Sequence, residues 1–182
     1  MYLRKRKENT KLRFIAHHDN LTHLPNRMLL TDRFKHSYAR SKQTQTYLAV
    51  CFIDLDHFKE VNDTYTHEVG DHILIETTKR ILKCIREEDT LSRHGGDEFI
   101  LLIGNMHDQH SVLEIIERIL DTLSSPYHVD ETTTVALSAS IGITFASETV
   151  HDLEVLIQQA DSAMYEAKAK GSNTFDHYLK PR

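Results

Sequence analysis

The sequence predicts an α+β domain in which helices cover the faces of a β-sheet. Segments with helical periodicity alternate along the chain with short apolar runs, in the order helix, strand, helix, hairpin, helix, strand, helix. With 182 residues, 40% of them hydrophobic, the chain is long enough for one domain with a substantial core and too short for two comfortable ones. We therefore expect one domain preceded by an N-terminal extension.

The first elements are expected to be helices. Residues 2–18 are polar and free of Gly and Pro, which predicts a helix that enters the domain. Asn26 is a candidate N-cap for a helix over residues 27–41. The expected buried face of that helix consists of Met28, Leu29, Leu30 and Phe34.

A central strand is expected over residues 47–53, a continuous apolar run that ends at Asp54-Leu55-Asp56. We expect a loop next, and it contains Phe58, Lys59, Asn62 and His67. A long helix should then run from about Val69 to Arg86. Its apolar stripe is Val69, Ile73, Leu74, Ile81, Leu82 and Ile85.

Two strand-like stretches, Leu91–His94 and Phe99–Ile103, predict a β-hairpin. Gly95-Gly96 between them tolerates the positive φ that a tight hairpin connection needs. Asp97-Glu98 then lies at the tip. A carboxylate pair in such a turn is either solvated or part of a metal site.

The remaining elements have clear periodicity. A helix is expected over His110–Leu123, a strand over residues 134–145, a helix over Leu153–Lys170 and a short edge strand over Asn173–Tyr178. The residues expected to face inward from the two helices are Val112, Ile116, Ile119, Leu123, Leu156, Ile157, Ala160, Met164 and Ala167.

Composition excludes several classes of protein. A formal net charge of -5 and an isoelectric point of about 6.2 argue against a general nucleic-acid binder. The basic residues within positions 1–13 indicate a solvated linker helix, or alternatively the cytosolic flank of a membrane segment outside this chain. The sequence contains neither a membrane-spanning apolar run nor a secretion signal, so we expect a cytoplasmic domain.

Cysteine and histidine usage gives no sign of a disulfide or a zinc site. Cys51 and Cys84 lie in apolar runs, as expected of reduced core thiols. The thirteen histidines are scattered without the paired spacing of zinc ligands.

The acidic residues suggest phosphate chemistry. A strand that ends in carboxylates and a hairpin tipped by carboxylates together could hold Mg²⁺, which prefers hard oxygen ligands and substrate phosphates. Lys59, five residues after Asp54, and Lys168 could hold phosphate oxygens, although each lysine taken alone is more often a solvated one. Asn62 and Asp71 are of types that can bind a guanine edge; otherwise they are a turn residue and a helix first-turn residue.

Residues 95–99 read Gly-Gly-Asp-Glu-Phe, and the chain resembles the GGDEF domains, the diguanylate cyclases, over residues 16–178. Further motifs occur in the family's order and spacing. They are Asp19-Asn20-Leu21-Thr22, Leu24-Pro25-Asn26-Arg27, Asp54-Leu55-Asp56-His57-Phe58-Lys59, Asn62-Asp63, His67, Gly70-Asp71, Arg93-His94, Asp161, Ala163-Met164-Tyr165, Ala167-Lys168, Gly171 and Asn173. The chain then divides into a linker or signalling helix (1–18), a GGDEF domain (19–178) and a tail (179–182).

The resemblance implies a central, mainly antiparallel sheet similar to that of nucleotidyl cyclase and polymerase palm domains, with an active-site β-hairpin. It also implies that two GTP molecules, one per subunit of an antiparallel homodimer, condense into cyclic di-GMP and pyrophosphate. Carried over by position, the ligands of Mg²⁺ (or Mn²⁺) are Asp54, the Leu55 carbonyl, Asp97 and Glu98. The catalytic positions are Asp97, which takes the place of the family's base, Glu98 and Lys59. The substrate-binding positions are Phe58, Lys59, Asn62, His67, Asp71, Gly95, Gly96 and Lys168.

A second site is implied by Arg86-Glu87-Glu88-Asp89, which has the Arg-x-x-Asp form of the family's product-inhibition site, at Arg86 and Asp89. An Arg at a helix C-terminus is the simpler interpretation. The spacing, and a guanidinium fork suited to phosphate or guanine, favour feedback binding of cyclic di-GMP.

Three positions depart from the family pattern. Thr66 and His23 replace glycines, and Ser172 replaces an arginine. Loss of that phosphate contact is expected to weaken GTP binding by roughly 1.5–3 kcal/mol unless Lys170 substitutes. These departures motivate an alternative: a weak or inactive GGDEF module that binds GTP or cyclic di-GMP and regulates an attached sensor, membrane or phosphodiesterase domain. A pure dimerisation scaffold would leave the acidic motif unexplained.

Overall fold

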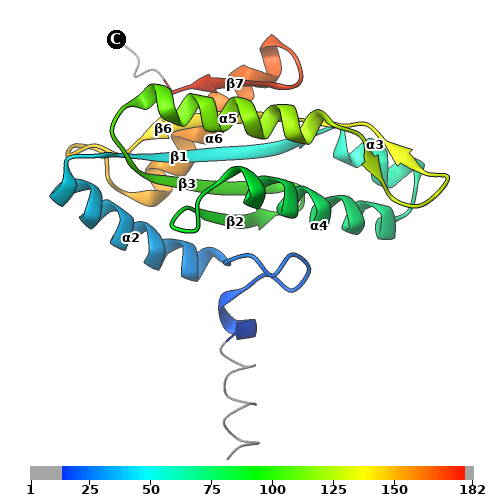
Figure 1. The fold of residues 1–182 in the computed structure, drawn as a ribbon, viewed down its shortest axis with the longest axis horizontal. Helices are drawn as coiled ribbons and strands as arrows, with labels where there is room; N and C mark the ends of the chain where they lie inside the picture. The colour runs from blue at the N-terminus through cyan, green and yellow to red at the C-terminus, as the bar shows by residue number, and fades with distance from the viewer. Residues whose placement is uncertain (1–13, 179–182) are drawn as a thin grey trace, which may run out of the picture.

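A five-stranded sheet in the order β2-β3-β1-β6-β7 organises residues 14–178, the part of the chain that this computed structural model describes (Figure 1). Its strands are β1 (Tyr47–Asp56), β2 (Thr90–Gly95), β3 (Glu98–Met106), β6 (Ser138–Phe145) and β7 (Thr174–His177). The pairs β1–β3, β1–β6 and β2–β3 are antiparallel and β6–β7 is parallel. The predicted fold class, α+β with a mainly antiparallel sheet, is confirmed.

Helices cover both faces of this sheet. They are α2 (Arg27–Thr44), α3 (Phe58–Thr64), α4 (His67–Cys84), α5 (Gln109–Ser124) and α6 (Leu153–Lys170). A separate two-stranded ribbon consists of β4 (Tyr127–His128) and β5 (Thr134–Val135). Among residues 14–178, no helix is both long and apolar enough to cross a bilayer.

Strand β1 divides the core into two layers because its side chains alternate between the faces of the sheet. Ala49, Cys51, Ile53 and Leu55 pack in the cluster that α3, α4 and α5 cover. Leu48, Val50 and Phe52 pack in the cluster that α2 and α6 cover. The next residues on this second face are Asp54 and Asp56, so the face changes from apolar to acidic where the strand ends.

Two predicted boundaries around β1 were wrong. The strand does not end before Asp54, because the ladder to β6 continues through Asp56, which pairs with Ser138. The expected loop after it contains the helix α3, where Phe58 and Val61 are buried. Two apolar residues three positions apart are too short a pattern to predict a helix.

The predicted strand over residues 134–145 also differs, because β5 belongs to the ribbon and β6 begins at Ser138. The alternating sequence contains no glycine or proline that would mark the break before β6. Helix α4 lies two residues earlier than expected and α2 continues to Thr44. A helix was predicted over residues 2–18, but residues 1–13 lie outside the part of the chain that the structure describes.

Several predicted core positions are confirmed and two are wrong. The inward residues predicted for α5 and α6 are buried, as are both cysteines, which are free thiols. Met28 and Leu82, however, are 64% and 48% exposed. On both helices, fewer apolar residues are buried than the sequence pattern predicted. The hydrophobic character of Met28 and Leu82 was therefore not enough to predict that they are buried.

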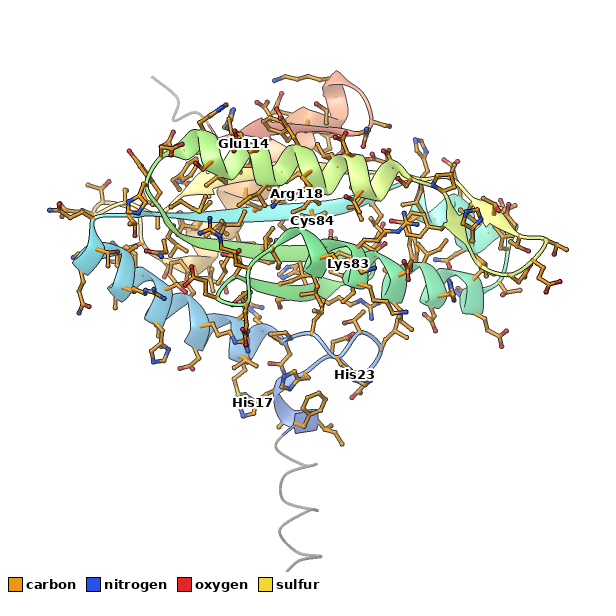
Figure 2. All side chains as sticks on the ribbon, in the orientation of Figure 1. His17, His23, Lys83, Cys84, Glu114 and Arg118 are labelled. Atoms are coloured by element: carbon orange, nitrogen blue, oxygen red, sulfur yellow. The ribbon has the colours of Figure 1, made fainter. Side chains whose placement is uncertain are left out.

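Helices α4 and α5 are joined by arginines rather than by apolar contacts alone. Figure 2 shows Cys84 and Arg118 near each other between the two helices, and Arg118 Nη2 donates to the Cys84 carbonyl at 2.6 Å. Arg80 donates to the carbonyl oxygens of Ser125 and Pro126 at 2.6 and 2.7 Å. Its guanidinium lies 3.8 Å from the centre of the Tyr127 ring. The end of α4 is therefore held by side chains that satisfy its own and its neighbour's carbonyl groups.

Helix α6 approaches β6 most closely at Gly142. A Cβ atom at this position would collide with the backbone of Ala160 and Met164. We expect Gly142→Ala to lower the free energy of unfolding by about 1–3 kcal/mol, because the helix must move away from the sheet. Urea denaturation measures this change.

Gly104→Ala is the matched control, since its Cβ would lie 3.8 Å from Leu48 Cδ1, an ordinary contact. Equal losses of stability in the two variants would contradict the proposed close packing.

Candidate active site

Asp54 and Glu98 face each other at the ends of β1 and β3. Directly opposed residues on antiparallel strands share a face and have Cβ atoms roughly 4.5–5.5 Å apart. Asp97 lies in the turn before Glu98, and its carbonyl accepts a hydrogen bond from the Leu55 backbone N–H at 3.4 Å. The hairpin therefore brings two carboxylates, Asp97 and Glu98, next to Asp54 at the end of β1.

Gly96 carries the turn of this hairpin. Its φ of 49° lies in the left-handed region, where a glycine has no Cβ to clash. Gly95 does not have a positive φ, so Gly96 alone of these two glycines adopts the conformation that the sequence predicted for the connection. Gly95 is instead the last residue of β2 and pairs with Glu98, after a register shift between Arg93 and Gly95.

The site concentrates negative charge next to the ammonium group of Lys168. Burial raises the pKa of Asp54, and the nearby charges of Asp97 and Glu98 raise it further, while Lys168 opposes the shift. Lys168 Nζ lies 2.6 Å from Asp54 Oδ1. Burial also raises the pKa of Asp97, against the charge of the same lysine. The folded chain thus holds Asp54 and Asp97 where their negative charge is disfavoured.

The donor set at this strand end fits a hard divalent cation. Asp54, Asp97 and Glu98 supply carboxylate oxygens, and Leu55, whose side chain is buried, could contribute its carbonyl. Within residues 14–178, no group of three or more His, Cys, Asp or Glu side chains is already arranged to coordinate a metal ion. Mg²⁺ typically takes one or two carboxylates and completes its shell with water and substrate phosphates, so an open acidic site suits it.

Asp56 has a different role from Asp54. It is buried, and its carboxylate accepts hydrogen bonds from Ser138 Oγ at 2.6 Å, Ser140 Oγ at 2.7 Å and the Asn173 backbone N–H at 3.2 Å. It therefore ties the segment that contains Ser172 to the end of β1. Sequence reasoning gave Asp56 no such role, because its serine partners lie more than eighty positions away in the chain.

The candidate nucleotide-binding residues gather around α3 and the start of α4. Phe58 is buried in the first turn of α3, and Lys59 beside it is exposed. The Asn62 amide lies against Gly70 so closely that a Cβ on Gly70 would collide with it. His67 and Asp71 are exposed and four residues apart on α4, so they share one face of the helix.

The departures from the family pattern have different consequences. Thr66 is the residue that precedes α4, and its φ of -114° is one that any residue adopts, so this position does not require a glycine. His23 has a φ of 59° and therefore bears the backbone strain that a glycine would avoid; Figure 2 labels it in the N-terminal turn. Ser172 is exposed, and Lys170 Nζ binds Asp176 Oδ2 at 2.7 Å. In this arrangement Lys170 does not replace the missing arginine.

An arginine connects the N-terminal turn to the hairpin tip. Arg93 Nε and Nη2 donate to the Gly96 carbonyl at 3.0 and 2.8 Å, and Arg93 Nη1 donates to Asp19 Oδ1 at 3.2 Å. Burial opposes ionisation of Asp19, but hydrogen bonds from Thr22 and the charge of Arg93 outweigh it and lower the pKa. This connection was not predicted, since only the fold brings residues 19 and 93 together.

In the predicted inhibitory motif, the two named residues have unequal exposure. Asp89 is buried and accepts hydrogen bonds from the backbone N–H groups of Arg86, at 2.9 Å, and Gly104, at 3.3 Å. The Arg86 side chain is 57% exposed. Asp89 shapes the loop, and Arg86 presents its guanidinium to solvent.

Residues 16–174 match the family model described as "Diguanylate cyclase, GGDEF domain". The chain belongs to the GGDEF domain family. Across 92% of its length this GGDEF domain is 42% identical to the bifunctional diguanylate cyclase/cyclic di-GMP phosphodiesterase MucR of Pseudomonas aeruginosa. Across 96% it is 37% identical to the diguanylate cyclase TpbB of the same species. It spans 24% of MucR and 41% of TpbB, so it corresponds to a part of each.

Solved structures agree with this assignment. The GGDEF domain of TpbB superposes with a TM-score of 0.85 at 35% identity, covering 90% of this chain and 95% of that one. The coiled coil and GGDEF domain of DgcB from Caulobacter crescentus, in complex with cyclic di-GMP, gives a TM-score of 0.84 at 26% identity, covering 97% and 93%.

Neutralising Asp97 should leave this GGDEF domain at least as stable as the wild type at pH 7. A carboxyl whose pKa is raised by folding stabilises the folded state below its unfolded pKa of about 4, and this contribution is lost as the pH rises through the folded pKa. Asp97→Asn removes the disfavoured charge, so its advantage should shrink as the pH falls toward 4. Thermal unfolding across this range, with Asp63→Asn on α3 as control, measures the effect; a marked loss of stability at pH 7 would contradict it.

Proposed function

We propose that this GGDEF domain condenses two GTP molecules into cyclic di-GMP and releases pyrophosphate. The observation that carries the proposal is the pairing of Asp54 with Glu98 across β1 and β3, with Asp97 in the adjoining turn. This places an open acidic site where a triphosphate and its counterion could bind. Relatives named as diguanylate cyclases support the same reaction.

Asp54, Asp97 and Glu98, with the Leu55 carbonyl, would hold Mg²⁺ or Mn²⁺. When bound, such an ion lowers the pKa of the ribose 3′-hydroxyl and neutralises the leaving pyrophosphate. The chain itself binds and orients the substrate. Lys168 forms an ion pair with Asp54, and its ammonium would hold phosphate oxygens of the substrate.

Asn62 and Asp71 would recognise guanine. An amide can donate to the guanine carbonyl, and a carboxylate can accept from the amino and imino groups. Asn62 is held in place by its packing against Gly70, and His67 and Asp71 project from one face of α4. Lys59 and the backbone of α3 near Phe58 would hold the phosphates from the other side.

The reaction joins two nucleotides, and each domain offers one such site. We therefore propose that catalysis takes place in a homodimer whose two sites face each other, so that each 3′-hydroxyl meets the other nucleotide's α-phosphorus. Because GTP is an intracellular substrate, the domain would work in the cytoplasm, joined to sensor, membrane or phosphodiesterase domains outside this chain.

A second function, regulation of an attached domain by nucleotide binding without turnover, is favoured by one observation. Ser172 lacks the charge that would hold the triphosphate, and Lys170 is engaged with Asp176. The relative MucR is named as a bifunctional diguanylate cyclase/cyclic di-GMP phosphodiesterase, which supports a regulatory function beside a phosphodiesterase.

Turnover distinguishes the two functions. We expect the dimeric domain to form cyclic di-GMP from GTP and Mg²⁺ in a chromatographic assay, and Asp97→Asn to reduce the rate at least a hundredfold by removing a carboxylate from the acidic site. As the pH is lowered, the rate should begin to fall at a pH above the ordinary carboxyl range. The reason is that the pKa values of Asp54 and Asp97 are raised, so these carboxylates become protonated earlier. Asp63→Asn should retain activity. GTP binding by a dimer that yields no product would instead support the regulatory function.

We also propose that cyclic di-GMP binds at Arg86 and inhibits the enzyme. The exposed guanidinium suits a phosphate or a guanine edge. Arg86→Ala should abolish tight binding of cyclic di-GMP in calorimetry, whereas Lys83→Ala, which removes a nearby exposed cation at the end of α4, should not. Unchanged affinity in Arg86→Ala would exclude the site.

A further inference from the structure

Glu88 lies between two arginines from different parts of the chain. Its Oε2 lies 3.1 Å from Arg40 Nη1 of α2, and its Oε1 lies 4.0 Å from Arg86 Nη1. The side chains of Arg40 and Arg86 are each 57% exposed and that of Glu88 is 35% exposed. One carboxylate therefore lies within ion-pair distance of two guanidinium groups at the surface and offsets one of their two positive charges.

The loop does not need Glu88 to keep its shape. Asp89, which is buried, already accepts hydrogen bonds from the backbone N–H groups of Arg86 and Gly104. The Asp89 backbone N–H in turn donates to the Arg86 carbonyl at 3.1 Å. These hydrogen bonds hold the backbone of the loop through a buried side chain. The Glu88 carboxylate takes no part in them and interacts instead with Arg40 and Arg86.

The space behind Glu88 is too small for a nucleotide. A cavity of about 20 Å³ lies between α2 and the C-terminal end of β3, and its lining includes Arg40, Glu88 and Gly104. This is room for little more than one water molecule. An anionic ligand of Arg86 must therefore approach from the solvent side, where Glu88 is already within reach of the guanidinium.

We propose that Glu88 is a built-in competitor for Arg86, held beside it by Arg40, and that it sets a weaker affinity for phosphate ligands than the arginines alone would give. This inference rests on the proposed binding of cyclic di-GMP at Arg86. A phosphate group that binds Arg86 must either displace the Glu88 carboxylate or bind beside it, where the two negative charges repel each other. Both outcomes lower the affinity for the phosphate. The residue thus determines the product concentration at which feedback begins.

The test compares Glu88→Gln with Glu87→Gln by calorimetry with cyclic di-GMP. The two variants remove the same charge from adjacent exposed positions of the loop. Glu88→Gln should bind about three- to tenfold more tightly than the wild type, whereas Glu87→Gln should change less. The difference should shrink at high salt, because screening weakens surface charge interactions. Thermal unfolding checks that both variants fold.

Unchanged or weaker binding by Glu88→Gln would overturn the inference, since Glu88 would then be neutral or would orient Arg86 for the ligand. An equal gain in Glu87→Gln would also overturn it, because the effect would be one of net charge. If the wild type binds and Glu88→Gln binds no more tightly, feedback at Arg86 stands and this inference alone fails. If neither protein binds cyclic di-GMP, the inference and the feedback site both fail, while GTP turnover on the same sample judges the cyclase activity separately.

Discussion

The register between β1 and β3 places Asp54 opposite Glu98, and the whole site depends on this pairing. A slip of one residue would turn every side chain of a strand to the other face of the sheet. Such a slip would bury Glu98 among the residues that face α4 and α5. The fully buried pair Ile53 and Phe99 next to the carboxylates makes that outcome costly, so the hydrophobic core sets the positions of the charged groups.

The acidic site lowers the stability of the folded domain, and contacts elsewhere in the domain compensate for this loss. The carboxylates of Asp54 and Asp97 are held partly out of water, which disfavours their charged forms. Stability comes from elsewhere, including the close fit of α6 on β6 at Gly142 and the arginine contacts between α4 and α5. Active sites commonly carry such disfavoured charge, because the groups that bind a cation must repel one another when it is absent.

The hairpin tip also depends on the start of the domain. Arg93 links the Gly96 carbonyl to Asp19, so the turn that carries Asp97 and the segment that precedes α2 are joined by direct hydrogen bonds. The loop at Arg86 is likewise joined to α2 through Glu88 and Arg40. Both proposed nucleotide sites are therefore in contact with residues 19–44, the segment that includes α2.

Local patterns in the sequence determined much of this domain. The apolar run of β1, the glycine turn before Asp97, the N-cap at Asn26 and the periodicity of α6 all depend on neighbouring residues, and the structure agrees with them. Tertiary structure alone decided the rest, because it depends on contacts between distant residues. Asp56 is an anchor since β6 brings Ser138 and Ser140 to it. Glu88 lies between two arginines since α2 packs beside the loop, and no local pattern encodes that approach.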